Sequence, residues 1–145
     1  MTRLLALTTI ISLALTACGK EEPMDDTRTV QSVAAEARRD IDALAAKVGR
    51  DPQVRQDTVT DCVPGRKGSG RMLDYVVAVT VDDDVATRLR GEIADELARD
   101  GWRVTVDSPT SVRFAKGGAT MGVKLSQQGR SVATVGGSGG CVEES

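Results

Sequence analysis

The chain has 145 residues, 19 basic against 21 acidic, with only three aromatic side chains and no histidine. This length allows one folded domain. A nearly neutral charge and few stacking rings argue against nucleic acid as a ligand. The missing histidine excludes Ser/His/Asp and Cys/His catalysis and His-ligated zinc. We therefore expect no metal, no cofactor and binding in preference to catalysis.

The first residues have the organisation of a secretory signal. Arg3 precedes an uncharged run at 4–15, which has the length of a signal-peptide hydrophobic region and is too short to span a membrane. The run ends in Leu15-Thr16-Ala17-Cys18, and Gly19 follows. This order, a branched residue, two small residues and a cysteine, resembles the lipobox of bacterial lipoproteins.

In lipoproteins with this motif, a transferase attaches diacylglycerol to the cysteine sulfur, and a peptidase then cuts before that cysteine. The resemblance implies a signal peptide at 1–17 and a lipidated Cys18, with palmitate-type acyl chains, on the outer face of the cytoplasmic membrane. Residues 18–27 would form the lipidated cysteine and its tether, in which the nine residues 19–27 are polar and reach at most about 30 Å. The alternative is an ordinary secretory signal with a cysteine near its cleavage site.

Two cysteines remain if Cys18 carries lipid. Cys62 and Cys141 would lie in a compartment where disulfides persist, so we expect them to pair. A redox pair or a thiol nucleophile is the alternative, but the chain has neither Cys-x-x-Cys spacing nor a histidine.

Apolar residues recur at helical spacing from Val30 to Val48, with Thr27 or Thr29 as a cap and Gly49 as the end. Beside a lipid anchor this helix could lie on the membrane, but its alanine-rich face favours packing on a sheet. A second helix is expected over Val85–Asp100, ended by Gly101. We interpret the preceding residues 82–84 as a cap and dipole partners and not as a calcium loop.

The rest of the chain predicts β-strands. Met72–Val81 alternates, with its odd positions apolar, as in a sheet covered on one side. Trp102 is expected to fill the seam between helix and sheet. The other predicted strands are Thr58–Val63, Trp102–Asp107, Ser111–Ala115, Ala119–Ser126 and Arg130–Val135, and the later ones point inward at Val104, Val106, Val112, Phe114, Met121, Val123 and Leu125.

This order predicts a single two-layer α+β domain over 28–145, with an antiparallel sheet of about five or six strands and two helices on one face. The disulfide is expected to tie the C-terminal tail to the sheet edge.

Two glycine-rich segments resemble functional motifs. Residues 136–140 match Gly-x-Ser-x-Gly, but the nucleophile elbow needs a following helix and a histidine, so we interpret them as a flexible tail. Residues 65–71 offer backbone N–H groups among Arg66, Lys67 and Arg71, candidates for contact with lipid phosphate or an anionic envelope polymer. A mobile hairpin is the simpler interpretation. The carboxylates of Asp57, Asp61 and Asp74 have no spacing that selects a catalytic pair.

The whole pattern resembles small lipoproteins of high-GC Gram-positive bacteria, in which a lipobox precedes an α+β domain with a cysteine pair. We expect a membrane-anchored binding or interaction module that meets an envelope protein or an anionic polymer. A carrier of small lipids or amphiphiles would instead need an apolar cavity large enough for an acyl chain. A carboxylate-based envelope enzyme would need a concave site that holds two close acidic groups.

Overall fold

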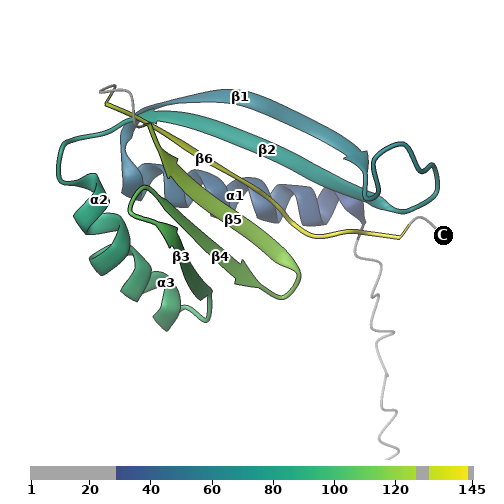
Figure 1. Ribbon diagram of the computed structural model, residues 1–145. Helices are drawn as coiled ribbons and strands as arrows, with labels where there is room; N and C mark the ends of the chain where they lie inside the picture. Colours follow the sequence, from purple (N-terminus) through teal and green to yellow (C-terminus); the bar gives the residue numbers. More distant parts are fainter. Residues whose placement is uncertain (1–28, 127–130, 144–145) are drawn as a thin grey trace, which may run out of the picture.

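The computed structural model describes residues 29–126 and 131–143. The predicted signal peptide, Cys18 and the tether lie outside these residues. Six strands form one antiparallel sheet in the order β1-β2-β6-β5-β4-β3, with the helices packed on it (Figure 1). The α+β class is confirmed. One core cluster joins residues of both helical segments to the inner positions of the strands, so both helical segments cover the same face of the sheet.

Helix α1 (Val30–Val48) begins and ends where the sequence predicts. The Thr29 hydroxyl accepts a hydrogen bond from the Ser32 backbone N–H at 3.1 Å, and Gly49 forms the C-cap. Its apolar face packs mainly on β2 and β6. Ile41, the most central residue of that face, is 1% exposed. The described part of α1 therefore uses its apolar face in the core, which leaves that face unavailable to a membrane.

Strand β1 (Arg50–Asp61) follows α1 almost directly and begins eight residues earlier than predicted. It is an edge strand that pairs only with β2 (Arg71–Thr80), and Asp51 takes a left-handed conformation with φ of 55°. Pro52 is tolerated because an edge strand has backbone N–H groups without ladder partners. Nearly every β1 residue is exposed, so its start carries no apolar alternation that the sequence could reveal.

The second helical segment comprises α2 (Val85–Arg88), a π-helical stretch η1 (Leu89–Ile93) and α3 (Ala94–Arg99). Its predicted inner face is buried, and Gly101, with φ of 88°, ends it. Asp84 occupies the N-cap position, but its side chain forms no capping hydrogen bond. The predicted N-cap position is therefore correct, but the capping hydrogen bond is absent. Two of the aspartates form ion pairs instead: the Asp84 carboxylate lies 3.6 Å from the Arg88 guanidinium, and the Asp82 carboxylate lies 2.6 Å from that of Arg50.

The C-terminal half supplies β3 (Arg103–Ser108), β4 (Ser111–Lys116), β5 (Ala119–Leu125) and β6 (Val132–Ser138). Phe114, Val123 and Val135 are at most 1% exposed. Val106, predicted to point inward, is 53% exposed. The prediction failed there because β3 is the second edge of the sheet and the helices do not cover its outer end.

Strand β6 inserts between β2 and β5 and continues through the glycine-rich segment. Gly136 pairs with Val76 and with Gly122, and Gly137 pairs with Tyr75 and Met121. The prediction of a flexible tail is wrong for these residues. A side chain at Gly137 would overlap the Thr120 carbonyl oxygen, so glycine is needed for close approach of the two strands.

Cys62 and Cys141 form the predicted disulfide, with Cα atoms 5.7 Å apart. Arg71 and Val142 exchange two backbone hydrogen bonds beside it, at 2.7 and 2.8 Å. The bridge ties the C-terminal tail to the end of the edge strand β1, as predicted, because Cys62 directly follows that strand. The tail reaches this point because the extension of the central strand β6 leads to the start of β2.

Candidate functional site

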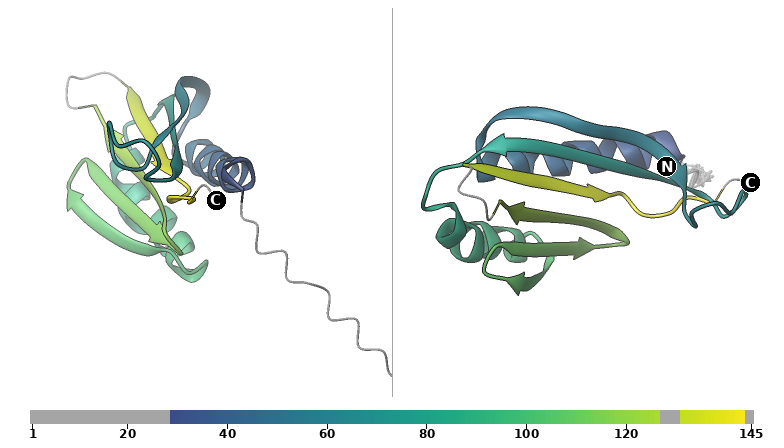
Figure 2. Two further views of the ribbon diagram at one scale, coloured as in Figure 1. Left: turned by 90° about the vertical axis from the view of Figure 1, so that its right-hand side faces the viewer. Right: turned by 45° about the horizontal axis from the view of Figure 1, so that its top comes forward.

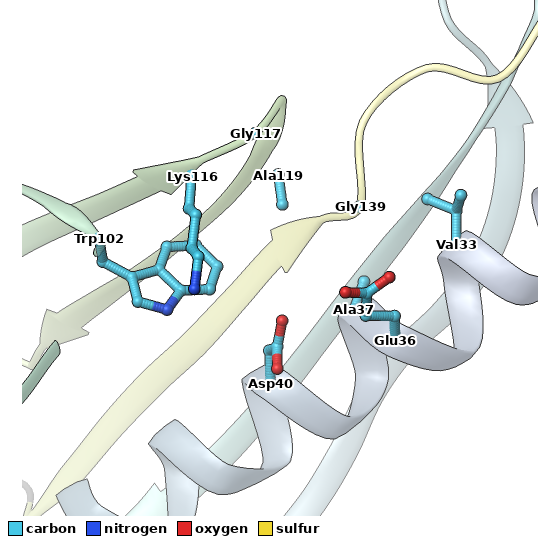
Figure 3. Close-up of a pocket in the computed structure, with 9 residues that line it drawn as sticks. All are labelled: Val33, Glu36, Ala37, Asp40, Trp102, Lys116, Gly117, Ala119 and Gly139. Atoms are coloured by element: carbon cyan, nitrogen blue, oxygen red, sulfur yellow. The ribbon is translucent and has the colours of Figure 1, made fainter. Parts of the chain in front are cut away.

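A pocket of about 300 Å³ opens between α1 and the turn that joins β4 to β5 (Figure 3). The first half of α1 forms one wall, and Trp102, directly before β3, forms the other. The sheet and the chain after β6 close the base. The lining residues are Val33, Glu36, Ala37, Asp40, Trp102, Lys116, Gly117, Ala119 and Gly139.

Two carboxylates enter this pocket from α1. Glu36 and Asp40 are one turn apart, so both side chains lie on the same side of the helix and face Trp102 and Lys116 (Figure 3). Burial raises the pKa of Asp40, and the negative charge of Glu36 raises it further, while Arg39 and Lys116 act in the opposite direction. The site therefore combines an exposed acidic group with a half-buried one whose raised pKa lets it keep its proton to higher pH than an ordinary aspartate.

Trp102 and Lys116 form the opposite wall. Gly101 turns the chain after α3, and the Trp102 backbone N–H donates to the Leu97 carbonyl at 2.9 Å, which directs the indole against the core. The Lys116 Nζ lies 5.9 Å from the indole centroid and donates to the Asp100 carbonyl at 2.7 Å. Trp102 fills the helix–sheet seam as predicted, and it also presents part of its surface to the pocket.

A small recess lies beside this pocket. Asp40, Trp102 and Ser138 are among the residues that line it. Ser138, the central serine of the Gly-x-Ser-x-Gly match, is 9% exposed, and its Oγ accepts a hydrogen bond from the Gly140 N–H at 3.2 Å. The residue ends strand β6 and no helix follows it among the described residues, so the strand–turn–helix geometry of a nucleophile elbow is not formed.

The predicted anion-contact residues are divided by the fold. Arg66 and Lys67 are exposed in the loop between β1 and β2, where Gly65, Gly68 and Gly70 all have positive φ. Arg71 belongs to β2, and its side chain lies against β1. Its Nη2 donates to the Val59 carbonyl at 2.9 Å, and its Nε lies 3.9 Å from an Asp61 carboxylate oxygen. The loop thus holds two of the three predicted cations at its tip.

The acidic residues that the sequence singled out do not form a pair. Asp57 receives a two-pronged ion pair from Arg38, Asp74 accepts a hydrogen bond from Gln56 at 2.6 Å, and Asp61 faces Arg71. The pair that shares a concave site is Glu36 and Asp40. Their four-residue spacing beside the apolar face of α1 was the available signal, and it was missed.

A second concave surface runs between α1 and β1. One hollow of about 360 Å³ is lined by Val30, Ala34 and Val59 together with polar side chains, and another of about 400 Å³ includes Pro52 and Val54. The side chains of Arg38 and Asp57 join α1 to β1 across this surface. In the filled core, by contrast, Phe114, Leu44 and Leu89 are each 1% exposed. An acyl chain would therefore have to lie in the open surface groove.

Among the residues that the structure describes, no three His, Cys, Asp or Glu side chains lie close enough together to hold a metal ion. No helix within residues 29–126 and 131–143 is long and apolar enough to cross a membrane. Comparison of the chain with protein-family models, curated proteins and solved structures found no match.

Proposed function

We propose that this protein is a lipid-anchored binding module on the outer face of the cytoplasmic membrane, and that it holds a small polar ligand in the Trp102 pocket. The anchor is inferred from the lipobox-like sequence ending in Cys18. The observation that carries the binding role is the convergence of one indole, two carboxylates and one ammonium group on a single hollow. A few polar groups around an apolar surface are the usual composition of a ligand site.

The chemistry of the lining favours a sugar ring or a similar polyhydroxylated ligand. The indole offers a flat apolar surface for the C–H face of such a ring. Glu36 and Asp40 can accept hydrogen bonds from hydroxyl or amino groups, and Lys116 can donate one. A volume of about 300 Å³ is at the small end of ligand pockets, which suits a single ring or the end of a longer chain.

Trp102 is the only tryptophan in the chain, so its fluorescence reports directly on this pocket. We expect titration with glucosamine, N-acetylglucosamine or N-acetylmuramic acid to change that fluorescence saturably. These three probes carry a positive, neutral or negative charge on a similar ring, and the two carboxylates should make the cationic probe bind most tightly. Asp40→Asn should weaken that binding by roughly tenfold or more, because it removes a charged hydrogen-bond acceptor.

Glu92→Gln is the matched control, since Glu92 is an exposed acid on the second helical segment and lies outside the pocket. It should leave the titration unchanged. A flat fluorescence response to all three probes, or equal binding by Asp40→Asn and the unmodified protein, would remove the support for this site.

The Glu36–Asp40 pair also favours a second candidate, a carboxylate-based hydrolase of envelope glycans. Asp40, with its raised pKa, would protonate the leaving oxygen, and Glu36 would act as the base or nucleophile. Binding and hydrolysis are separated by one comparison: an enzyme would release product from an oligomeric N-acetylglucosamine substrate, and Asp40→Asn would abolish that release. A binding module would hold the same oligomer without product.

A further inference from the structure

The start of α1, the loop between β1 and β2, and the chain after β6 lie together at one end of the domain (Figures 1 and 2). The disulfide joins Cys62 in this loop to Cys141, and Gly139 packs close to Val33 in α1. A tether from Cys18 would therefore enter the domain at this end. From here on, "the basal end" denotes residues 62–70 with the adjoining chain at 139–143.

We infer that the basal end rests on the membrane, with the loop tip in contact with anionic phospholipid headgroups. This inference rests on the proposed lipid anchor, which would keep the end within reach of the bilayer, because only residues 19–28 lie between Cys18 and the described structure. Extended, these residues reach at most about 35 Å. The lipid surface is thus always at high effective concentration for the loop.

The loop tip has the chemistry of an interfacial contact. Arg66 and Lys67 are exposed and form no ion pair with any other described residue. Val63, beside them, is 47% exposed, and Pro64 is exposed as well. Cationic side chains next to exposed apolar ones suit the boundary between phosphate groups and acyl chains.

The other described charges at this end, those of Arg71, Asp61 and Glu143, sum to −1. Arg71 faces Asp61 at 3.9 Å, and Glu143 is an exposed carboxylate on the C-terminal side. The two loop cations therefore give the basal end its attraction to an anionic leaflet. Each surface cation strengthens such contact by roughly fivefold, so the net excess of one positive charge would favour this orientation by roughly fivefold.

The orientation can be measured with the mature chain, residues 18–145, coupled through its Cys18 thiol to a maleimide phospholipid in vesicles. The disulfide leaves Cys18 as the one free thiol. Two tryptophan reporters are compared on the same exposed strand, Thr60→Trp near the basal end and Gln53→Trp about 23 Å away. Quenching by a nitroxide-headgroup lipid is recorded after subtraction of the Trp102 signal of the parent chain.

In vesicles that contain phosphatidylglycerol, we expect the reporter at 60 to be quenched at least about threefold more than the reporter at 53. Arg66→Glu with Lys67→Glu should reduce this ratio towards one, as should high salt. The matched control, Arg90→Glu with Arg99→Glu, changes net charge equally. Both arginines are exposed and donate to carbonyls of their own helical segment, so the ratio should persist.

Equal quenching of the two reporters, or a ratio unaffected by the loop reversal, would overturn the inference. Equal ratios on phosphatidylglycerol and phosphatidylcholine vesicles, combined with loop-dependent binding of soluble polyglycerol phosphate, would assign the loop to an anionic polymer instead. Because the lipid is attached chemically, the outcome does not depend on whether cells lipidate Cys18. The vesicle experiment therefore tests the orientation of the domain, and lipidation of Cys18 is tested separately by intact mass.

Discussion

Gly137 shows how a residue without a side chain determines the position of a whole strand. It lies in β6 between two neighbouring strands, and any Cβ there would overlap the Thr120 carbonyl oxygen and crowd the Met121 Cα. Gly91, in the π-helical stretch, has open space around the same position. The fold therefore requires glycine at position 137, whereas position 91 has room for a larger residue.

We predict that Gly137→Ala lowers the free energy of unfolding by about 3 kcal/mol, the upper end for overpacking at a site that cannot relax. Gly91→Ala should raise it by about 0.5–1 kcal/mol, because alanine costs less conformational entropy in a helix. Urea denaturation of both variants measures the difference. Equal stability of the two variants would contradict the close packing of β6 against β5.

Residue chemistry explains which parts of the candidate site the sequence could reveal. Trp102 was placed in the seam because a helix stop precedes it. Its relation to Glu36 and Asp40 was hidden, because more than 60 residues separate them and only the strand order brings them together. Arg71 was grouped with Arg66 and Lys67 because it is adjacent in sequence, whereas strand alternation turns its side chain towards Val59 and Asp61.

Among the helices and strands, the spacing of apolar residues predicted the inner face correctly wherever one face of the element is buried. Helix α1, strand β2 and the second helical segment all have the predicted inner faces. The start of β1 was missed because an exposed edge strand has no buried face to impose alternation. The end of β6 was missed because glycines normally mark turns, and here they allow β6 to lie close to its neighbours.

The disulfide connects two elements that no hairpin joins, the loop after β1 and the extension of β6. Cys62→Ser with Cys141→Ser should lower the free energy of unfolding by roughly 4 kcal/mol, because the cysteines are separated by 79 residues and the bridge restricts the unfolded chain. Thermal and urea unfolding measure this change. Val63→Ala, an exposed neighbour in the same loop, should alter stability by less than about 0.5 kcal/mol.

The disulfide prediction has a direct chemical check. Cys62 and Cys141 should resist alkylation in the native protein until a reductant is added. Rapid alkylation of both thiols without reductant, or a double-serine variant as stable as the parent, would contradict a structural role for the bridge.

At the scale of the whole molecule, the fold gives the proposed anchor a consistent geometry. The chain enters α1 at the basal end, where the loop cations and the disulfide also lie (Figure 1). The Trp102 pocket uses the first half of α1, and one of its lining residues, Gly139, belongs to the basal end. A domain tethered in this way would hold its pocket close to the membrane surface.

The proposed membrane role depends most on lipidation of Cys18. Its most direct measurement is the intact mass and membrane partition of the protein expressed in a bacterial host. We predict a mature chain that begins at Cys18, carries the added mass of diacylglycerol and leaves the membrane fraction only in detergent. Cys18→Ser should yield the uncleaved, unacylated precursor. An unmodified mature chain, or the same acylated product from Cys18→Ser, would contradict lipidation at Cys18.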